Sequence, residues 1–236
     1  MCSYVAMCLK FKIIYSITMI SQAEENYLKA IFKISEREAK AANTNAVAAE
    51  LKTTAASVTD MLRKLAEKEL IFYEKYRGVT LTTEGVRQAT QLIRKHRIWE
   101  VFLCERLGYA WDECHDLAEQ LEHIQSNDLI DRLDEFLGKP KFDPHGDPIP
   151  DQNGNITERQ QRLLSALAVT EKGIVVGVDE HSPAFLQHLN RIGVVLGVKI
   201  EILEIFDFDG SIRLRINNAA EVVVSDRVSN GVFVKI

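Results

Sequence analysis

The feature that most constrains the fold of this chain is a proline-rich segment between two stretches of different hydrophobic period. Residues 138–155 hold four of the five prolines in the 236-residue sequence, and proline interrupts both helices and central strands. Before this segment, apolar residues recur at helical spacing; after it, short runs rich in Val and Ile alternate with turn residues. We therefore expect a linker or a rigid irregular segment, preceded by helices and followed by a small β-barrel.

The part before the prolines shows the element order of a DNA-binding fold. Five consecutive segments have helical, helical, turn, helical and hairpin patterns: 21–39, 44–51, Lys52–Thr54, 55–69 and 70–82. Ser21 is a candidate N-cap of the first helix, and Arg77-Gly78 marks the hairpin turn. This order is that of a winged helix-turn-helix, in which the helix after the turn enters a major groove of DNA.

The rest of the chain is expected to be helical first and then β-rich. Three helices are expected before the prolines: 84–107, 111–124 and 126–137. From residue 157 we expect a helical stretch to residue 167, and one or two helical turns within 182–193. Five runs have the composition of short strands: 173–178, 198–206, 211–216, 221–225 and 231–236. The fold class is therefore mainly α with added β-structure.

Charge and cysteine content limit the class of protein. A net charge of −5 argues against a protein that coats nucleic acid without selection, but a local basic patch still suffices for DNA binding. The four cysteines form no CxxC pair, so we expect neither a disulfide framework nor a thiolate zinc site, as is typical of the reducing cytoplasm. They are Cys2, Cys8, Cys104 and Cys114.

The first eighteen residues are apolar but match no targeting segment well. They show no clear cleavage site, and they are too short and too interrupted to span a bilayer. Met19 precedes a well-formed amphipathic helix. We expect translation to start at or near Met19, with residues 1–18 as an upstream extension; a targeting segment is the alternative. No membrane partner is expected.

The helix that begins at Ala55 is the candidate DNA-reading element. Short polar groups at its start are candidates for base contacts: Ser57, Thr59 and Asp60. Basic and hydroxyl side chains around it, and the tip of the hairpin, are candidates for phosphate contacts: Lys52, Thr53, Thr54, Arg63, Lys64, Lys75 and Arg77. The alternative is an ordinary helical hairpin with a solvated polar face; the basic hairpin favours DNA.

Histidines and glutamates in two segments have the spacing of metal ligands. In CHDLAEQLEHI, four such side chains fall on one face of the expected helix, at i, i+4, i+7 and i+8: His115, Glu119, Glu122 and His123. In RKHRIWE, His96 and Glu100 lie at i and i+4. Imidazole and carboxylate ligands favour Mn(II), Fe(II), Co(II) or Zn(II), and so many carboxylates suit a six-coordinate or binuclear site. The alternatives are a solvated polar face and a metallohydrolase, whose HExxH order is absent from these two segments.

Together these segments resemble the diphtheria-toxin-repressor family of metal-dependent regulators, in particular its manganese-transport-regulator branch. The resemblance rests on AEENYLKAIFKI, on VAAELKTTAASVTDMLRKLAEKELIFYEKYRGVTLTTEG, on RKHRIWEVFL and on HDLAEQLEHIQSNDLIDRLDEFLG with DPHGDPIP after it. It covers about residues 21–150, and the tail from residue 157 is similar to the SH3-like or FeoA-like domain of the family.

The resemblance implies a metal site built from His96, Glu100, His115, Glu119, Glu122 and His123. Manganese-responsive members have a glutamate where Glu119 stands, and iron-responsive members tend to have a sulfur ligand. The family ligand on the first helix is usually Asp or Met, but here the position holds Asn26, and Lys29 stands where a carboxylate can occur. Glu24 or Glu25 could serve as the ligand of the first helix in place of Asn26. Glu180 and His181 are weaker candidates from the C-terminal domain.

Together, the sequence patterns and the resemblance imply five regions: a flexible or non-native extension, a winged helix-turn-helix domain, a helical dimerisation and metal-binding domain, a Pro/Gly-rich linker and an SH3-like or FeoA-like domain. Their bounds are 1–18, 19–83, 84–140, 141–156 and 157–236. The expected function is a cytoplasmic homodimeric repressor that binds operator DNA with Mn(II) and controls metal-uptake genes, without a small-molecule substrate or enzyme activity. Fe(II) is the alternative metal, and Zn(II) or Co(II) can substitute in vitro. A metal-dependent hydrolase or a metal-binding protein without specific DNA binding is the alternative of another class.

Overall fold

The computed structural model describes residues 20–74, 77–157 and 160–236, so the predictions for residues 1–18 and for Lys75 lie outside the described residues. The chain divides into two compact units. One reaches to Ile93 and includes Gln152–Gly154; the other comprises Arg94–Asp151 and Asn155–Ile236. Among the described residues, no helix has the length and apolar character needed to cross a membrane.

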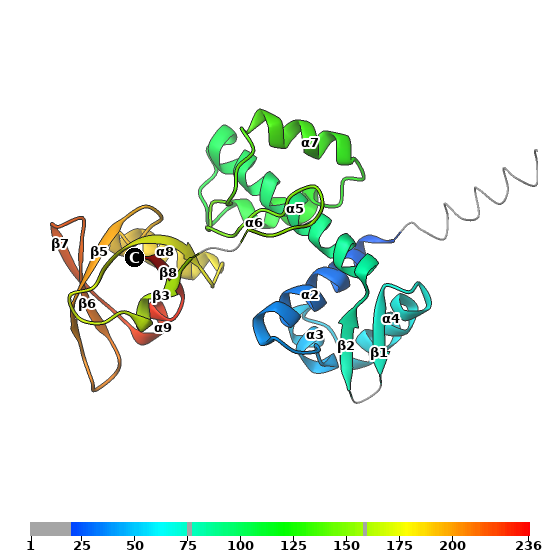
Figure 1. Ribbon diagram of the computed structural model, residues 1–236, viewed down its shortest axis with the longest axis horizontal. Helices are drawn as coiled ribbons and strands as arrows, with labels where there is room; N and C mark the ends of the chain where they lie inside the picture. Colours follow the sequence, from blue (N-terminus) through cyan, green and yellow to red (C-terminus); the bar gives the residue numbers. More distant parts are fainter. Residues whose placement is uncertain (1–19, 75–76, 158–159) are drawn as a thin grey trace, which may run out of the picture. The chain divides into compact units, whose positions relative to one another are not determined.

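The first unit has the predicted winged helix-turn-helix order (Figure 1). Its elements are α2 (Gln22–Glu38), α3 (Thr44–Glu50), α4 (Ala55–Glu67), β1 (Ile71–Glu74), β2 (Gly78–Leu81) and the start of α5 (Thr83–Leu107). Strands β1 and β2 pair antiparallel, with Ile71 opposite Leu81. A bridge between Ala42 and Val79 joins the hairpin to the segment before α3.

Side-chain caps set the start of each helix in this unit. Ser21 and Glu24 form a capping box at α2, while Asn43 and Thr54 cap α3 and α4. Glu24 Oε1 also lies 2.7 Å from Nζ of Lys68, just after α4. Burial raises the pKa of Glu24, but the hydrogen bonds from Lys68 and Ser21 outweigh it and lower that pKa overall. One carboxylate thus both caps α2 and ties it to the end of α4.

The core of the first unit is built from the apolar faces that the helical spacing predicted. Leu28, Ile31 and Ile34 of α2 are fully buried, together with Val58, Leu62 and Leu65 of α4. Met61, one helical turn after Val58, is only partly buried. The buried stripe of α4 leaves its opposite face exposed to solvent, and that face carries the candidate DNA contacts.

In the second unit, the rest of α5 packs with α6 (Cys114–Leu121) and α7 (Asn127–Phe136). Ile98 and Val101 of α5 share an apolar cluster with Ile130 of α7 and with Ile149 of the proline-rich segment. The helix expected over 111–124 is shorter than predicted, because residues 111–113 form a turn and the helix ends at Leu121.

The proline-rich segment is irregular but packed, which favours the second of the two interpretations from the sequence. Apart from the bridge between Phe142 and Pro148, it forms no regular structure over residues 139–155. Arg97 of α5 holds it by donating to the Pro148 carbonyl and to Asp147 Oδ2 (3.2 Å), and its Nε lies 3.5 Å from Asp143 Oδ2. A rigid loop therefore leads from α7 to the β-rich part.

The β-rich part forms one six-stranded sheet of antiparallel neighbours in the order β3-β8-β4-β5-β6-β7. Its strands are β3 (Arg162–Leu163), β4 (Lys172–Val178), β5 (Lys199–Ile205), β6 (Ile212–Ile216), β7 (Ala220–Val224) and β8 (Val232–Lys235). Helices α8 (Pro183–Ile192) and α9 (Asp226–Ser229) complete it, and Leu186 and Leu189 of α8 are fully buried in its core. All five strands expected from the sequence are present.

The helical stretch expected over 157–167 is wrong within the described residues. Arg162–Leu163 is strand β3, paired with β8, and Leu164–Ala166 is a short 3-10 helix, η1. Leu164 and Leu167 are both buried in the core of the sheet. Tertiary packing of these apolar residues overrides the local helix propensity of the segment.

Replacing Leu62 by Ala should lower the free energy of unfolding of the first unit by about 2–5 kcal/mol, because a fully buried side chain is removed. Hydrogen exchange of the α4 amides measures this unit separately from the other. The exposed Val86→Ala is the control and should change stability by less than ~0.5 kcal/mol. A loss below ~1 kcal/mol for Leu62→Ala would contradict the packing of α4.

Candidate metal centre

Helix α5 contributes His96 and Glu100, one turn apart and both buried. His96 Nε2 lies 3.0 Å from Glu100 Oε1. The other ring nitrogen of His96, Nδ1, faces the fully buried Glu122, with 2.7 Å to Glu122 Oε2. His96 is thus positioned between carboxylates from two parts of the chain.

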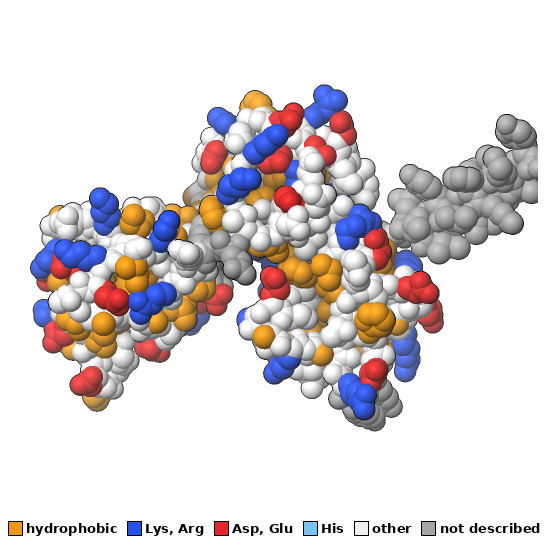
Figure 2. Space-filling view, viewed as in Figure 1, with side chains coloured by type: hydrophobic (Ala, Val, Ile, Leu, Met, Phe, Trp, Pro, Cys, Tyr) orange, Lys and Arg blue, Asp and Glu red, His pale blue; other side chains and the backbone are white. Residues whose placement is uncertain are grey.

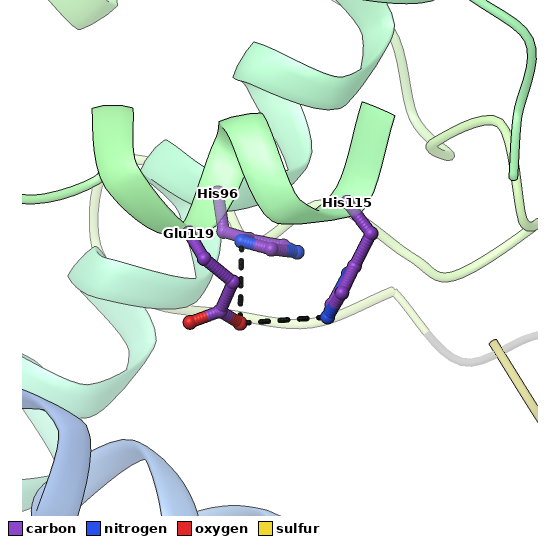
Figure 3. Close-up of side chains that lie close together, drawn as sticks. All are labelled: His96, His115 and Glu119. Atoms are coloured by element: carbon purple, nitrogen blue, oxygen red, sulfur yellow. Dashed lines mark ion pairs between the residues drawn. The ribbon is translucent and has the colours of Figure 1, made fainter. Parts of the chain in front are cut away.

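Helix α6 adds His115 and Glu119, which lie on the face toward His96. Glu119 Oε1 lies 3.8 Å from His96 Nδ1 and 3.7 Å from His115 Nε2, and its carboxylate points between the two rings (Figure 3). His115 Nδ1 contacts Glu100 Oε1 at 3.1 Å. The ligand atoms of His96, His115 and Glu119 all lie within 4.8 Å of one another.

Glu122 and His123 complete the predicted set, but not from within the helix. Glu122 is the C-cap of α6 and His123 lies in the following turn. His123 Nε2 lies 3.9 Å from Glu122 Oε1. The structure therefore brings together all six residues that the resemblance assigned to the metal, although the single helix face inferred for four of them extends over α6 and the turn after it.

The electrostatics of the cluster favour a bound cation. Burial alone raises the pKa of Glu100, but the charge of His96 and the neighbouring imidazoles of His115 and His145 lower that pKa well below its usual range. A buried carboxylate that stays ionised needs nearby positive charge. A divalent metal would supply that charge in place of the protons on the imidazoles.

The geometry of the donors fits a transition-metal ion. Two ligands on one ion, each bonded at about 2.0–2.2 Å, lie roughly 2.8–3.6 Å apart for angles between octahedral and tetrahedral values. The separations from Glu119 to the two imidazoles, 3.7 and 3.8 Å, are close to this range and longer than normal hydrogen bonds. The donors are imidazole nitrogens and carboxylate oxygens, which suit Mn(II), Fe(II), Co(II) or Zn(II).

Two further residues beside the cluster were missed by the analysis of single helices. His145 of the rigid loop is fully buried; its Nε2 donates to the Trp111 carbonyl (2.7 Å), and its Nδ1 lies 3.6 Å from Glu100 Oε2. Asp143 Oδ1 accepts from the backbone N–H of His145 at 2.8 Å. The signal was present in the motif DPHGDPIP, where a histidine and carboxylates lie among prolines that hold them rigid.

These two residues have strongly shifted pKa values. Burial alone lowers the pKa of His145, but the nearby carboxylates of Glu100 and Asp143 outweigh it and raise that pKa to about 9. Burial, together with the negative charges of Glu100 and Asp147, raises the pKa of Asp143 to about 7. The cluster around Glu100 therefore extends beyond the two helices into the loop.

The weaker ligand candidates have different surroundings. Asn26 lies in α2 of the first unit, and its Oδ1 is buried without a hydrogen-bond partner among the described residues. Both carboxylate oxygens of Glu180 accept from Nη2 of Arg227, each at 3.0 Å, and Oε1 also accepts from Ser182. His181 stacks on His145, with ring centroids 4.6 Å apart, and its Nε2 lies 3.8 Å from Asp147 Oδ2. These side chains remain predictions as ligands.

The candidate DNA-reading face of α4 is open to solvent. Seven of its predicted contact residues are exposed: Lys52, Thr53, Thr54, Ser57, Asp60, Arg63 and Lys64. Thr59 is partly buried and donates to the Ala55 carbonyl (2.9 Å), while Arg63 pairs with Asp60 at 3.2 Å. Arg77 at the hairpin tip is exposed and pairs with Glu74. Basic and acidic side chains are interspersed on the face shown in Figure 2, consistent with a net charge of −5.

Replacing Glu119 by Ala should weaken binding of Mn(II) by at least about tenfold, because it removes the oxygen that lies between both imidazoles. Isothermal titration of the purified protein with Mn(II) measures the affinity. Gln120→Ala on the exposed side of the same helix is the matched control and should bind as the parent protein does. Equal affinity of the Glu119→Ala protein would contradict the site.

Comparison with known proteins agrees with this architecture. The family model for the N-terminal DNA-binding domain of iron-dependent repressors matches residues 19–79, and the model for their metal-binding and dimerisation domain matches residues 82–151. A model of the FeoA domain matches residues 162–236. Three models thus account for each described part of the fold in order.

Individual relatives cover the chain to different extents. The regulator MntR of Oceanobacillus iheyensis is 33% identical over 53% of this chain and 84% of its own length. The iron-dependent repressor IdeR of Mycobacterium leprae is 31% identical over 53% of this chain, which spans only 54% of the length of that protein. A solved manganese-dependent transcriptional repressor in complex with manganese is 35% identical, covers 89% of this chain and 98% of its own, and has a TM-score of 0.80. The chain belongs to the iron-dependent repressor family of metal-dependent transcriptional repressors, to which the diphtheria toxin repressor, IdeR and MntR also belong.

Proposed function

We propose that this chain is a Mn(II)-activated homodimeric repressor that binds operator DNA in the cytoplasm and controls metal-uptake genes. The observation that carries the proposal is the convergence of His96, His115 and Glu119, whose ligand atoms lie within 4.8 Å of one another. In a regulator of this family, such a cluster would bind metal, and its occupancy would follow the metal concentration. Its family consists of DNA-binding repressors, which decides against the hydrolase alternative.

The preference for Mn(II) rests on Glu119. A carboxylate at this position provides a hard oxygen donor, whereas a sulfur ligand would favour softer ions. The manganese complex among the solved relatives supports this preference, and the relatedness to IdeR keeps Fe(II) as the alternative. Zn(II) or Co(II) should bind the same nitrogen and oxygen donors in vitro, as a related repressor structure with Zn²⁺ bound suggests.

The donor set is large enough for more than one ion. His96, Glu119, Glu122 and His123 would hold a first ion, with Asn26 as a further neutral oxygen ligand. Glu100 and His115 would serve a neighbouring position, to which the missed residues Asp143 and His145 lie close. Glu180 and His181 stay the weaker candidates from the β-rich part.

The proposed mechanism is thermodynamic linkage between metal and DNA. If the metal-bound protein binds operator DNA more tightly than the metal-free protein does, the DNA-bound protein must bind metal more tightly than the free protein by the same factor. A coupling of about 1–3 kcal/mol would change operator affinity by roughly 5–150-fold. In a dimer, two α4 helices would meet successive major grooves, about 34 Å apart.

The decisive experiment incubates the purified protein with sheared DNA from its own genome, with Mn(II) or with chelator, and sequences the retained fragments. Discrete fragments enriched only with Mn(II) are the expected result. Glu122→Ala should lose this enrichment while remaining a folded dimer, because the carboxylate facing His96 Nδ1 is removed. Enrichment independent of metal would contradict metal activation, and enrichment only with Fe(II) in the absence of oxygen would favour the alternative metal.

Replacing Arg63 by Ala should weaken binding to operator DNA and to unrelated DNA by similar factors. An exposed basic side chain on α4 is expected to contact phosphates and not bases. The slope of log affinity against log salt concentration should fall by about 1. The exposed Arg132→Ala on α7 is the matched control and should leave both quantities unchanged. A selective loss for operator alone would instead place Arg63 among the base contacts.

A further inference from the structure

Two cysteine side chains lie next to the metal cluster without a part in the function proposed above. Cys104 belongs to α5 and Cys114 is the first residue of α6. Both are free thiols, Cys114 buried and Cys104 partly exposed. Cys104 packs against the apolar cluster that Cys114 forms with Leu103 and Ala118. Each thiol also shifts the pKa of the other: Cys114 lowers the pKa of Cys104, and Cys104 raises the pKa of Cys114. The sulfur atoms are therefore neighbours in space although nine residues separate them in sequence.

We propose that Cys104 and Cys114 form a dithiol that hydroperoxides oxidise to a disulfide, and that this disulfide weakens the metal site beside it. The first part rests on the packing of Cys104 against the cluster that contains Cys114, and on the solvent access of Cys104. The second part rests on the proposed function, because it concerns metal binding at the cluster of His96, His115 and Glu119.

The chemistry needs one molecule of peroxide for each disulfide. The sulfur of the partly exposed Cys104 attacks one oxygen of hydrogen peroxide; the O–O bond breaks, and the products are a sulfenic acid and water. The sulfur of Cys114 then attacks the sulfenic sulfur, an S–S bond forms, and the hydroxyl group leaves as a second water with the thiol proton. Two thiols lose two electrons in total, and the peroxide takes them up.

The position of the disulfide explains its expected effect on metal. It would join α5, which carries His96 and Glu100, to α6, which carries His115 and Glu119. Cys114 Sγ lies within 4.8 Å of ligand atoms of Glu100 and His145. A disulfide bond brings two sulfur atoms to about 2.0 Å, well inside van der Waals contact, and metal–ligand distances in real sites stay within about 0.2 Å of their standard values. We expect the movement at Cys114 to displace its neighbour His115.

The test uses the full chain, reduced and then treated with hydrogen peroxide, which catalase removes before further steps. Trypsin cleaves after Arg97, Arg106 and Arg132, so the two cysteines fall in different peptides, 98–106 and 107–132. Mass spectrometry without reductant should show these peptides joined, 2 Da lighter than their sum. Titration with Mn(II) should show at least tenfold weaker binding after oxidation. Reduction with dithiothreitol should restore the original affinity.

Cys104→Ser is the control for other oxidative damage. It cannot form the disulfide and should keep its Mn(II) affinity through the same peroxide treatment. Absence of the joined peptide, or a joined peptide with Mn(II) affinity unchanged within about twofold, would overturn the proposal. Failure of the reduced protein to bind Mn(II) would instead overturn the proposed function, and this outcome is distinct because it precedes any oxidation.

Discussion

The second unit depends on burying two carboxylates beside one histidine. Glu100 is 1% exposed and Glu122 is fully buried, and each faces a ring nitrogen of the same histidine, His96. Removing an ionised carboxylate from water costs several kcal/mol unless positive charge and hydrogen bonds replace the solvent. The packing of α5 against α6 is therefore compatible with these residues only because imidazoles, and in the proposed function a metal ion, lie between them.

Much of this arrangement could be predicted from the sequence, because helical spacing is a local property. The i, i+4 pairs His96–Glu100 and His115–Glu119 each share a helix face, and the structure confirms that both pairs meet. The buried stripe of α4 was likewise visible as an apolar repeat. The winged helix-turn-helix order and the five strands followed from the same kind of periodicity.

Features that depend on packing between distant segments could not be predicted in this way. His145 reaches Glu100 because Arg97 anchors a loop some fifty residues further along the chain, and no local pattern encodes that contact. The segment around Leu164 looked helical because its leucines have a suitable spacing, but pairing of Arg162–Leu163 with β8 decided its conformation. Helix α6 also ends at Leu121, earlier than expected, so Glu122 and His123 follow the helix and do not lie within it.

The proline-rich loop has a consequence for the entropy of folding. Each proline has a fixed φ angle, so the unfolded chain already samples fewer conformations over residues 138–155 than an ordinary segment would. Ordering this loop around Arg97 therefore loses less conformational entropy. A stretch without helix or strand can thus hold a fully buried histidine beside Glu100, and do so without the backbone ladders that ordinarily fix a side chain in place.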